Sequence, residues 1–196
     1  MTKKECELNR NFVVLGMRNM PFLVTICLLA LVACNSKSKK ESNAIEFKNV
    51  NQSVAKSFSD LKTPDTFKIE LTGRKPAEMV LNFTIKNAAG KEIYNTKIKG
   101  TELLGNTDPN IDLSKEQDQV IFLKTIADDF FSDDNFLEPA VMPEDKADKY
   151  TPDKTLYEEL KKSGLNGFKY RLGKENNIYI AWSEKEKKVK VYYNCC

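Results

Sequence analysis

The chain contains no histidine among its 196 residues. Histidine is the commonest general base near neutral pH and the commonest metal ligand in proteins. Its absence excludes Ser-His-Asp and Cys-His relays, and it also excludes zinc or iron sites built on histidine. The two phosphate-binding fingerprints, G-x-x-x-x-G-K-[ST] and G-x-G-x-x-G, are missing as well. We therefore expect neither a nucleotide ligand nor histidine-dependent catalysis.

The chain also lacks a large excess of charge of either sign. The formal net charge is +3. Four basic and two acidic residues precede Cys34, so the remainder carries 27 basic and 26 acidic side chains. Lysines and acidic residues are interleaved along the chain, which provides no extended basic surface to attract a polyanion. We therefore expect no nucleic-acid partner.

Long hydrophobic runs are absent except for one near the N-terminus. Residues 21–33, PFLVTICLLALVA, are free of charge and follow Arg18 and three more distant basic residues, which is the order of an export signal. A membrane-spanning helix needs about 20 apolar residues, so a cleaved signal is the better interpretation. Met17 opens a compact version of the same segment, and translation starts either at Met1 or at Met17.

The end of this run, Leu31-Val32-Ala33-Cys34, resembles the lipobox of bacterial lipoproteins. The resemblance covers only the export segment. It implies that the signal peptide 1–33 is cut between Ala33 and Cys34, and that the Cys34 sulfur carries diacylglycerol, with a further acyl chain such as palmitate on the new amino group. The chemistry needs a thiol nucleophile and a small residue before the cut. An ordinary cleaved signal with a chance cysteine is the alternative.

Several acyl chains would hold the protein at a bilayer, because each buried methylene contributes about 0.8 kcal/mol. Asn35, rather than Asp, follows the cysteine, and in similar lipoproteins this favours the outer membrane over the inner membrane. Residues 34–43 contain no apolar side chain after the cysteine and predict a flexible linker. We thus expect a lipid-anchored protein of the cell envelope.

Residues 44–196 predict one α+β domain with a mostly antiparallel sheet, and we identify no family for them. Alternating apolar and polar residues predict a strand over 65–73 and a hairpin over 79–98, whose loop contains Asn87 and Gly90. Three more alternating runs predict a C-terminal meander. Its inward positions are expected at Phe168, Tyr170, Leu172, Ile178, Ile180, Trp182, Val189, Val191 and Tyr193.

Two helices are predicted between these groups of strands. Residues 114–131 have apolar positions at helical spacing, and Ser114 with Gln117 has the spacing of a capping box. Residues 151–164 begin with Thr151 as the cap and Pro152 at the first helical position, and they end at Gly164. Residues 50–61 also carry apolar side chains at roughly helical spacing, which indicates a further helix.

Five carboxylates crowd one short segment: Asp128, Asp129, Asp133, Asp134 and Glu138. A calcium site is one interpretation, since calcium prefers oxygen ligands. The segment lacks the order of an EF-hand loop, so a solvated acidic helix end is the favoured interpretation and no metal is expected. The same acids could supply a glycosidase pair, because that reaction needs no histidine.

Cys195 and Cys196 end the chain. They could close a vicinal disulfide, offer two soft metal ligands, or simply finish the last strand with one thiol bonded to another molecule. One pair lacks the four ligands of a structural zinc site. It also lacks the spacing of a C-x-x-C redox motif.

Aromatic residues are concentrated in the C-terminal runs. Alternation predicts that Tyr179 and Tyr192 point to the face of the meander opposite the inward positions. Left open, that face would be an aromatic patch suited to a protein or glycan partner. The predicted helices need a sheet to pack on, so we favour a face that they cover.

These observations predict a lipid-anchored envelope protein with no catalytic residues and no cofactor other than its acyl chains. We expect it to act as a binding or assembly module with a protein partner in the envelope. Two alternatives stay open. One is a tethered inhibitor that resembles immunity proteins, and the other is a carboxylate-dependent hydrolase of envelope polymers.

Overall fold

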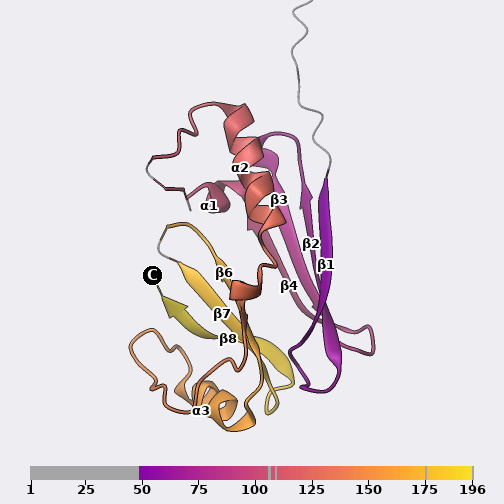
Figure 1. Ribbon diagram of the computed structural model, residues 1–196, viewed down its shortest axis with the longest axis vertical. Helices are drawn as coiled ribbons and strands as arrows, with labels where there is room; N and C mark the ends of the chain where they lie inside the picture. The colour runs from indigo at the N-terminus through magenta and orange to yellow at the C-terminus, as the bar shows by residue number, and fades with distance from the viewer. Residues whose placement is uncertain (1–48, 106, 109, 175, 196) are drawn as a thin grey trace, which may run out of the picture. The chain divides into compact units, whose positions relative to one another are not determined.

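Two four-stranded antiparallel sheets, each formed by strands consecutive in the chain, make up the framework of the structure (Figure 1). The structure is a computed structural model and describes residues 49–105, 107–108, 110–174 and 176–195. The predicted α+β class with antiparallel pairing is confirmed. The predicted hairpin and the predicted meander, however, belong to two different sheets.

The first sheet contains β1 (Val50–Ser57), β2 (Pro64–Thr72), β3 (Val80–Lys86) and β4 (Glu92–Lys99). The second contains β5 (Phe136–Leu137), β6 (Gly167–Arg171), β7 (Asn177–Ser183) and β8 (Lys188–Cys195). The α-helices are α1 (Gly100–Leu104), α2 (Glu116–Asp128) and α3 (Lys154–Ser163), and the short 3-10 helices are η1 (Pro76–Glu78) and η2 (Asp133–Asn135).

The predicted signal peptide 1–33 and the predicted linker 34–43, including Cys34, lie outside the described residues. No helix in the described part of the chain combines the length and the apolar composition that crossing a bilayer requires.

The first sheet follows the alternation of its sequence. Phe67 and Ile69 of β2 are fully buried and pair with Ile85 and Phe83 of β3. The predicted hairpin is present as β3 and β4. Asn87 organises its loop, because its side-chain oxygen accepts hydrogen bonds from the backbone N–H groups of residues 89 and 91 at 3.1 and 3.0 Å.

The helix expected over residues 50–61 is wrong, because this segment forms strand β1 and the turn after it. Every second residue of β1 faces inward, and two of these inward positions are the polar Gln52 and Lys56. Gln52 donates to the carbonyl of Asp128 at 3.2 Å, and Lys56 pairs with Asp133 at 3.0 Å. Because these inward positions of an edge strand are polar, the sequence of β1 lacks the alternation of apolar and polar residues that would predict a strand.

Both long helices are present, but each begins later than predicted. Helix α2 has Lys115 at its N-cap position with no side-chain cap, so the capping box predicted from Ser114 does not form. Helix α3 is capped by Asp153, whose carboxylate accepts from the N–H of Leu156 at 3.0 Å, and not by Thr151. Gly164 ends α3 in the left-handed conformation, as the sequence predicts.

The predicted meander is present as β6, β7 and β8, with a β-bulge in β8. Tyr193 pairs with Tyr179, whereas Val191 pairs with Ile180, so Tyr192 is an extra residue on β8. The extra residue reverses the facing of the residues after it. Tyr193 therefore lies on the same face as Tyr179, and its predicted inward position beside Val191 is wrong.

An aromatic core joins the two sheets. Phe67 and Phe83 of the first sheet lie 5.4 and 5.3 Å, between ring centroids, from Phe168 of the second sheet. The hydroxyls of Tyr94 on β4 and Tyr170 on β6 form a hydrogen bond of 2.8 Å across the same junction. The two sheets therefore share one hydrophobic core.

A second contact between the sheets lies at the C-terminal end of β1. The Asn166 side-chain amide donates to the carbonyl of Ser57 at 3.0 Å. Asn166 immediately precedes β6, so this bond places the end of β1 beside the start of β6. A second, smaller apolar cluster forms where α3 packs on β7 and β8, on the face of the second sheet away from the shared core.

Candidate functional site

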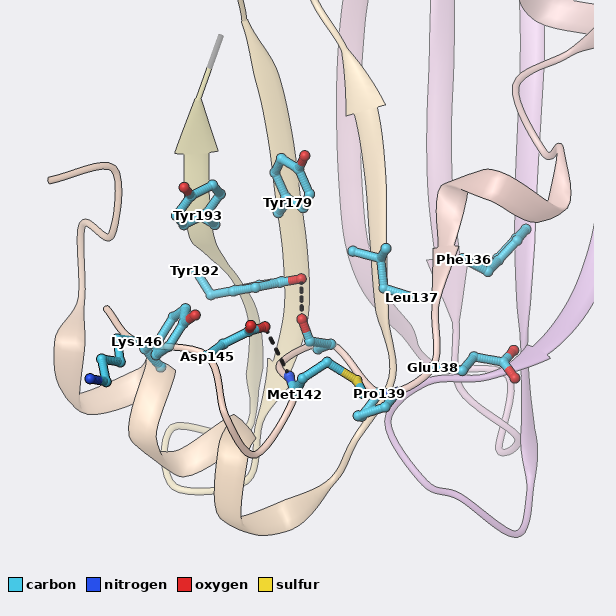
Figure 2. Close-up of a pocket in the computed structure, with 12 residues that line it drawn as sticks. Phe136, Leu137, Glu138, Pro139, Met142, Asp145, Lys146, Tyr179, Tyr192 and Tyr193 are labelled. Carbon is cyan, nitrogen blue, oxygen red and sulfur yellow. Dashed lines mark hydrogen bonds between the residues drawn. The ribbon is translucent and has the colours of Figure 1, made fainter. Parts of the chain in front are cut away.

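A pocket of about 540 Å³ lies on this outer face of the second sheet (Figure 2). Its walls come from β5, β7, β8, helix α3 and the segment 138–146. The lining residues are Phe136, Leu137, Glu138, Pro139, Ala140, Met142, Asp145, Lys146, Tyr157, Tyr179, Tyr192 and Tyr193. Its volume falls within the range of about 300–1,000 Å³ that is usual for small-molecule sites.

Three tyrosines from two neighbouring strands form the sheet side of the pocket. Tyr179 stands on β7, and Tyr192 and Tyr193 are adjacent on β8 (Figure 2). The ring centroids of Tyr179 and Tyr193 are 5.3 Å apart with an angle of 87° between the planes. Adjacent strand residues normally point to opposite faces. The bulge in β8 is therefore what brings Tyr192 and Tyr193 to one pocket.

The hydroxyls of two of these tyrosines bind the loop that forms the pocket wall and continues beyond it. The Tyr192 hydroxyl donates to the carbonyl of Ala140 at 2.8 Å, as Figure 2 shows. The Tyr193 hydroxyl donates to the Asp148 carboxylate at 2.9 Å. Both bonds tie the segment 138–150 to the sheet.

The pKa values of the same tyrosines lie above the ordinary range. Burial raises the pKa of Tyr192. Burial raises the pKa of Tyr193 as well, and the hydrogen bond to the Asp148 carboxylate raises it further. Burial likewise raises the pKa of Tyr179. All three phenols therefore stay protonated and uncharged at neutral pH.

A glycine allows the segment 139–141 to lie directly on the sheet. A Cβ atom at Gly167 would be 2.9 Å from the Ala140 Cβ and 3.0 Å from the Tyr192 hydroxyl oxygen. No side chain fits in that space. The Ala140 N–H donates to the carbonyl of Leu165 at 2.8 Å, which holds the segment in this position.

Charged and apolar side chains alternate around the mouth of the pocket. Glu138, Asp145 and Lys146 are exposed, and Met142 is 44% exposed. The Asp145 carboxylate accepts from the Met142 N–H at 3.2 Å, which fixes the turn between them. Lys161 of α3 donates to the Asp145 carbonyl at 2.5 Å. The mouth is therefore held in shape by α3.

The carboxylates considered as a calcium site form no group that could hold a metal ion within the described residues, and the glycosidase pair stays an untested alternative. Asp133 pairs with Lys56, and the carbonyl and carboxylate of Asp128 accept from Gln52. Asp129 and Asp134 are exposed. Within the described residues, no three carboxylate or cysteine side chains come together in a way that could hold a metal ion. Glu138 lies at the mouth of the pocket.

Cys195 is half-buried at the end of β8 and has a free thiol. Its sulfur lies 4.0 Å from the Tyr179 hydroxyl oxygen. Cys196 lies outside the described residues, so the predicted relation between the two thiols stays a prediction.

The aromatic face of the second sheet is partly covered and partly open, so each of the two predicted alternatives holds in part. Helix α3 covers Tyr192, which is 2% exposed, whereas Tyr179 and Tyr193 are half-buried and line the pocket. Sequence reasoning found Tyr179 and Tyr192 but placed Tyr193 on the wrong face. It missed the wall formed by the segment 138–146, because this wall is an irregular loop without periodicity.

Comparisons with protein-family models, with curated proteins and with solved structures give no match to this chain. The chemistry of the pocket is therefore the guide to function. It combines neutral aromatic walls with charged groups at the mouth, which suits the binding of a ligand that is partly apolar and partly polar.

Proposed function

We propose that this chain is a lipid-anchored protein of the cell envelope that acts by binding a partner in the tyrosine-lined pocket. The observation that carries the binding role is the pocket itself. The Tyr192 hydroxyl holds the wall at Ala140 and the Tyr193 hydroxyl holds the following loop at Asp148, while Tyr179 and Tyr193 line the interior. Rigid aromatic side chains in a preformed hollow favour binding, because little conformational entropy is lost when a ligand enters.

The anchoring role is supported by the sequence Leu31-Val32-Ala33-Cys34 after an apolar export segment. Acylation of Cys34 would place the domain at a membrane surface. Asn35 supports the outer membrane as the destination. The partner is then a component of the envelope or a molecule that arrives there.

Binding is favoured over catalysis by the state of the groups around the pocket. The chain has no histidine, and its pocket tyrosines have pKa values raised further from neutrality. A general acid or base works best with a pKa near the working pH. The tyrosines therefore serve better as contact surfaces than as proton-transfer groups.

The anchor is tested by comparing two cysteine variants in cells. Cys34→Ser removes the proposed acylation site, and we expect it to leave the membrane fraction. Cys27→Ser is the matched control, because it changes a cysteine within the export segment but not the lipobox. Mass spectrometry of the mature N-terminal peptide should show acyl chains on Cys34. An unmodified Cys34 in a chain that keeps its leader would overturn the anchoring role.

The binding role is tested by cross-linking in intact membranes. We expect the unaltered chain to capture a defined partner and Tyr179→Leu to lose it, because the substitution keeps an apolar side chain but removes the ring. Exposed Asp134 lies outside the pocket lining, so Asp134→Asn should capture the partner normally. A partner that both variants retain equally would exclude the pocket as the binding site.

A further inference from the structure

We propose that the pocket binds a neutral saccharide unit of an envelope glycan. This inference rests on the proposed binding function and names the chemical class of the ligand. It is supported by three features of the pocket: the tyrosine walls, the mixture of charges at the mouth, and the rigid attachment of the segment 138–146.

The tyrosine walls suit the apolar side of a sugar ring. An aromatic face carries partial negative charge, and the C–H groups along one side of a pyranose carry partial positive charge. Tyr179 and Tyr193 stand at nearly a right angle, 5.3 Å apart, and both line the pocket. Two rings at this angle form a corner, and a flat ring can pack against one of them while its edge meets the other.

The mouth suits the hydroxyl side of a sugar. Glu138 and Asp145 offer carboxylate oxygens that accept hydrogen bonds, and Lys146 offers an ammonium group that donates them. Sugar hydroxyls both donate and accept, so they can use all three groups. Asp145 accepts one bond from the Met142 N–H, but a carboxylate has several acceptor positions and keeps capacity for a ligand.

The charges at the mouth also select against other ligand classes. Glu138 and Asp145 lie beside Lys146 and Lys161, so the mouth has no net positive charge that would attract a polyanion such as a phosphorylated chain. A lipid tail would have to enter between charged groups that it cannot satisfy. A polyhydroxylated neutral ligand meets neither obstacle.

The rigidity of the wall supports selectivity for a ligand of defined shape. The Ala140 N–H and the Ala140 carbonyl are both hydrogen-bonded, to Leu165 and to Tyr192, at 2.8 Å each. Asp145 is fixed by Met142 and Lys161. A wall held at both ends keeps its polar groups in place before the ligand arrives, which lowers the entropic cost of binding.

The test is calorimetric titration of the full chain, purified in detergent, with three neutral oligosaccharides: triacetylchitotriose, maltotriose and isomaltotriose. We expect at least one to bind at millimolar concentration. Tyr179→Leu should weaken that binding by about tenfold or more, and Asp145→Asn by a smaller factor. Asp145 is exposed, and asparagine keeps a side-chain oxygen that can accept from the Met142 N–H, so the replacement should preserve the fold. Asp134→Asn is the matched control outside the pocket and should bind as the unaltered chain does.

Two results would overturn the saccharide assignment. One is the absence of binding to all three sugars, and the other is binding that Tyr179→Leu and Asp145→Asn leave unchanged. Titration with short neutral peptides then separates the two proposals. Peptide binding that Tyr179→Leu abolishes would retain the pocket as a binding site and reject only the sugar. A partner captured in membranes independently of Tyr179 would reject the binding role of the pocket itself.

Discussion

Replacing Gly167 with alanine tests the idea that close contact between the segment 139–141 and β6 shapes the pocket. The new Cβ would lie 2.9 Å from the Ala140 Cβ, and real Cβ contacts are essentially never shorter than 3.0 Å. It would also lie 3.0 Å from the Tyr192 hydroxyl oxygen. The segment must therefore move away from the sheet, and the Tyr192–Ala140 hydrogen bond must stretch or break.

The expected cost is the sum of overpacking and a lost hydrogen bond. Inserting a methyl group into a packed site costs about 1–3 kcal/mol. A lost hydrogen bond costs about 1 kcal/mol more. We therefore expect Gly167→Ala to lower the free energy of unfolding by about 2–4 kcal/mol, and the melting temperature by about 5–15 °C.

The assay is urea and thermal unfolding of the full chain, followed by circular dichroism. Ala140→Gly provides the matched control, because it removes the methyl group that the new Cβ would strike. The double variant should regain part of the stability, so the two changes should not be additive. The reasoning is refuted if Gly167→Ala alone unfolds within about 0.5 kcal/mol of the unaltered chain.

Three further predictions concern other parts of the fold. Tyr94→Phe should lower the free energy of unfolding by about 1–3 kcal/mol, because it leaves the buried Tyr170 hydroxyl without its partner at 2.8 Å. In urea unfolding, the Tyr94→Phe/Tyr170→Phe double variant should lose less stability than the sum of the two single variants. Hydrogen bonds from Lys190 and from the backbone of the first turn of α3 lower the pKa of Asp153. The ionised carboxylate should therefore stabilise the fold fully at neutral pH, and this stabilisation should be lost as the pH falls through the lowered pKa. At pH 7, Asp153→Ala should lower the free energy of unfolding by about 1 kcal/mol. Asp153→Asn should lower it less, because asparagine can still cap the helix. Calcium should leave the melting temperature unchanged, and a stabilisation that Asp133→Asn abolishes would contradict this.

The strands of the first sheet were predictable where one face is buried and the other is exposed to solvent. Residues 65–73 show this alternation clearly, because Phe67, Ile69 and Leu71 pack into the shared core. Strand β1 was not predictable from the same rule. Its inward face carries Gln52 and Lys56, whose partners in and after α2 are far away in the sequence. A long-range polar contact leaves no local pattern.

The candidate site was predictable only in part. Alternation places Tyr179 and Tyr192 on the outer face of the second sheet, and the structure agrees. The position of Tyr193 depends on a bulge, which inserts one residue and reverses the facing of the strand beyond it. No residue in the sequence of β8 indicates that a bulge forms there. The loop wall at Ala140 depends in turn on the absence of a side chain at Gly167, a relation between residues 27 positions apart.

Strand β1 links the first sheet to the base of the pocket. The strand begins at Val50 and ends at Ser57, which is bonded to Asn166 next to Gly167 at the base of the pocket. Its seven steps span about 24 Å. Movement at the base of the pocket would therefore be transmitted to the first sheet through the Asn166–Ser57 hydrogen bond.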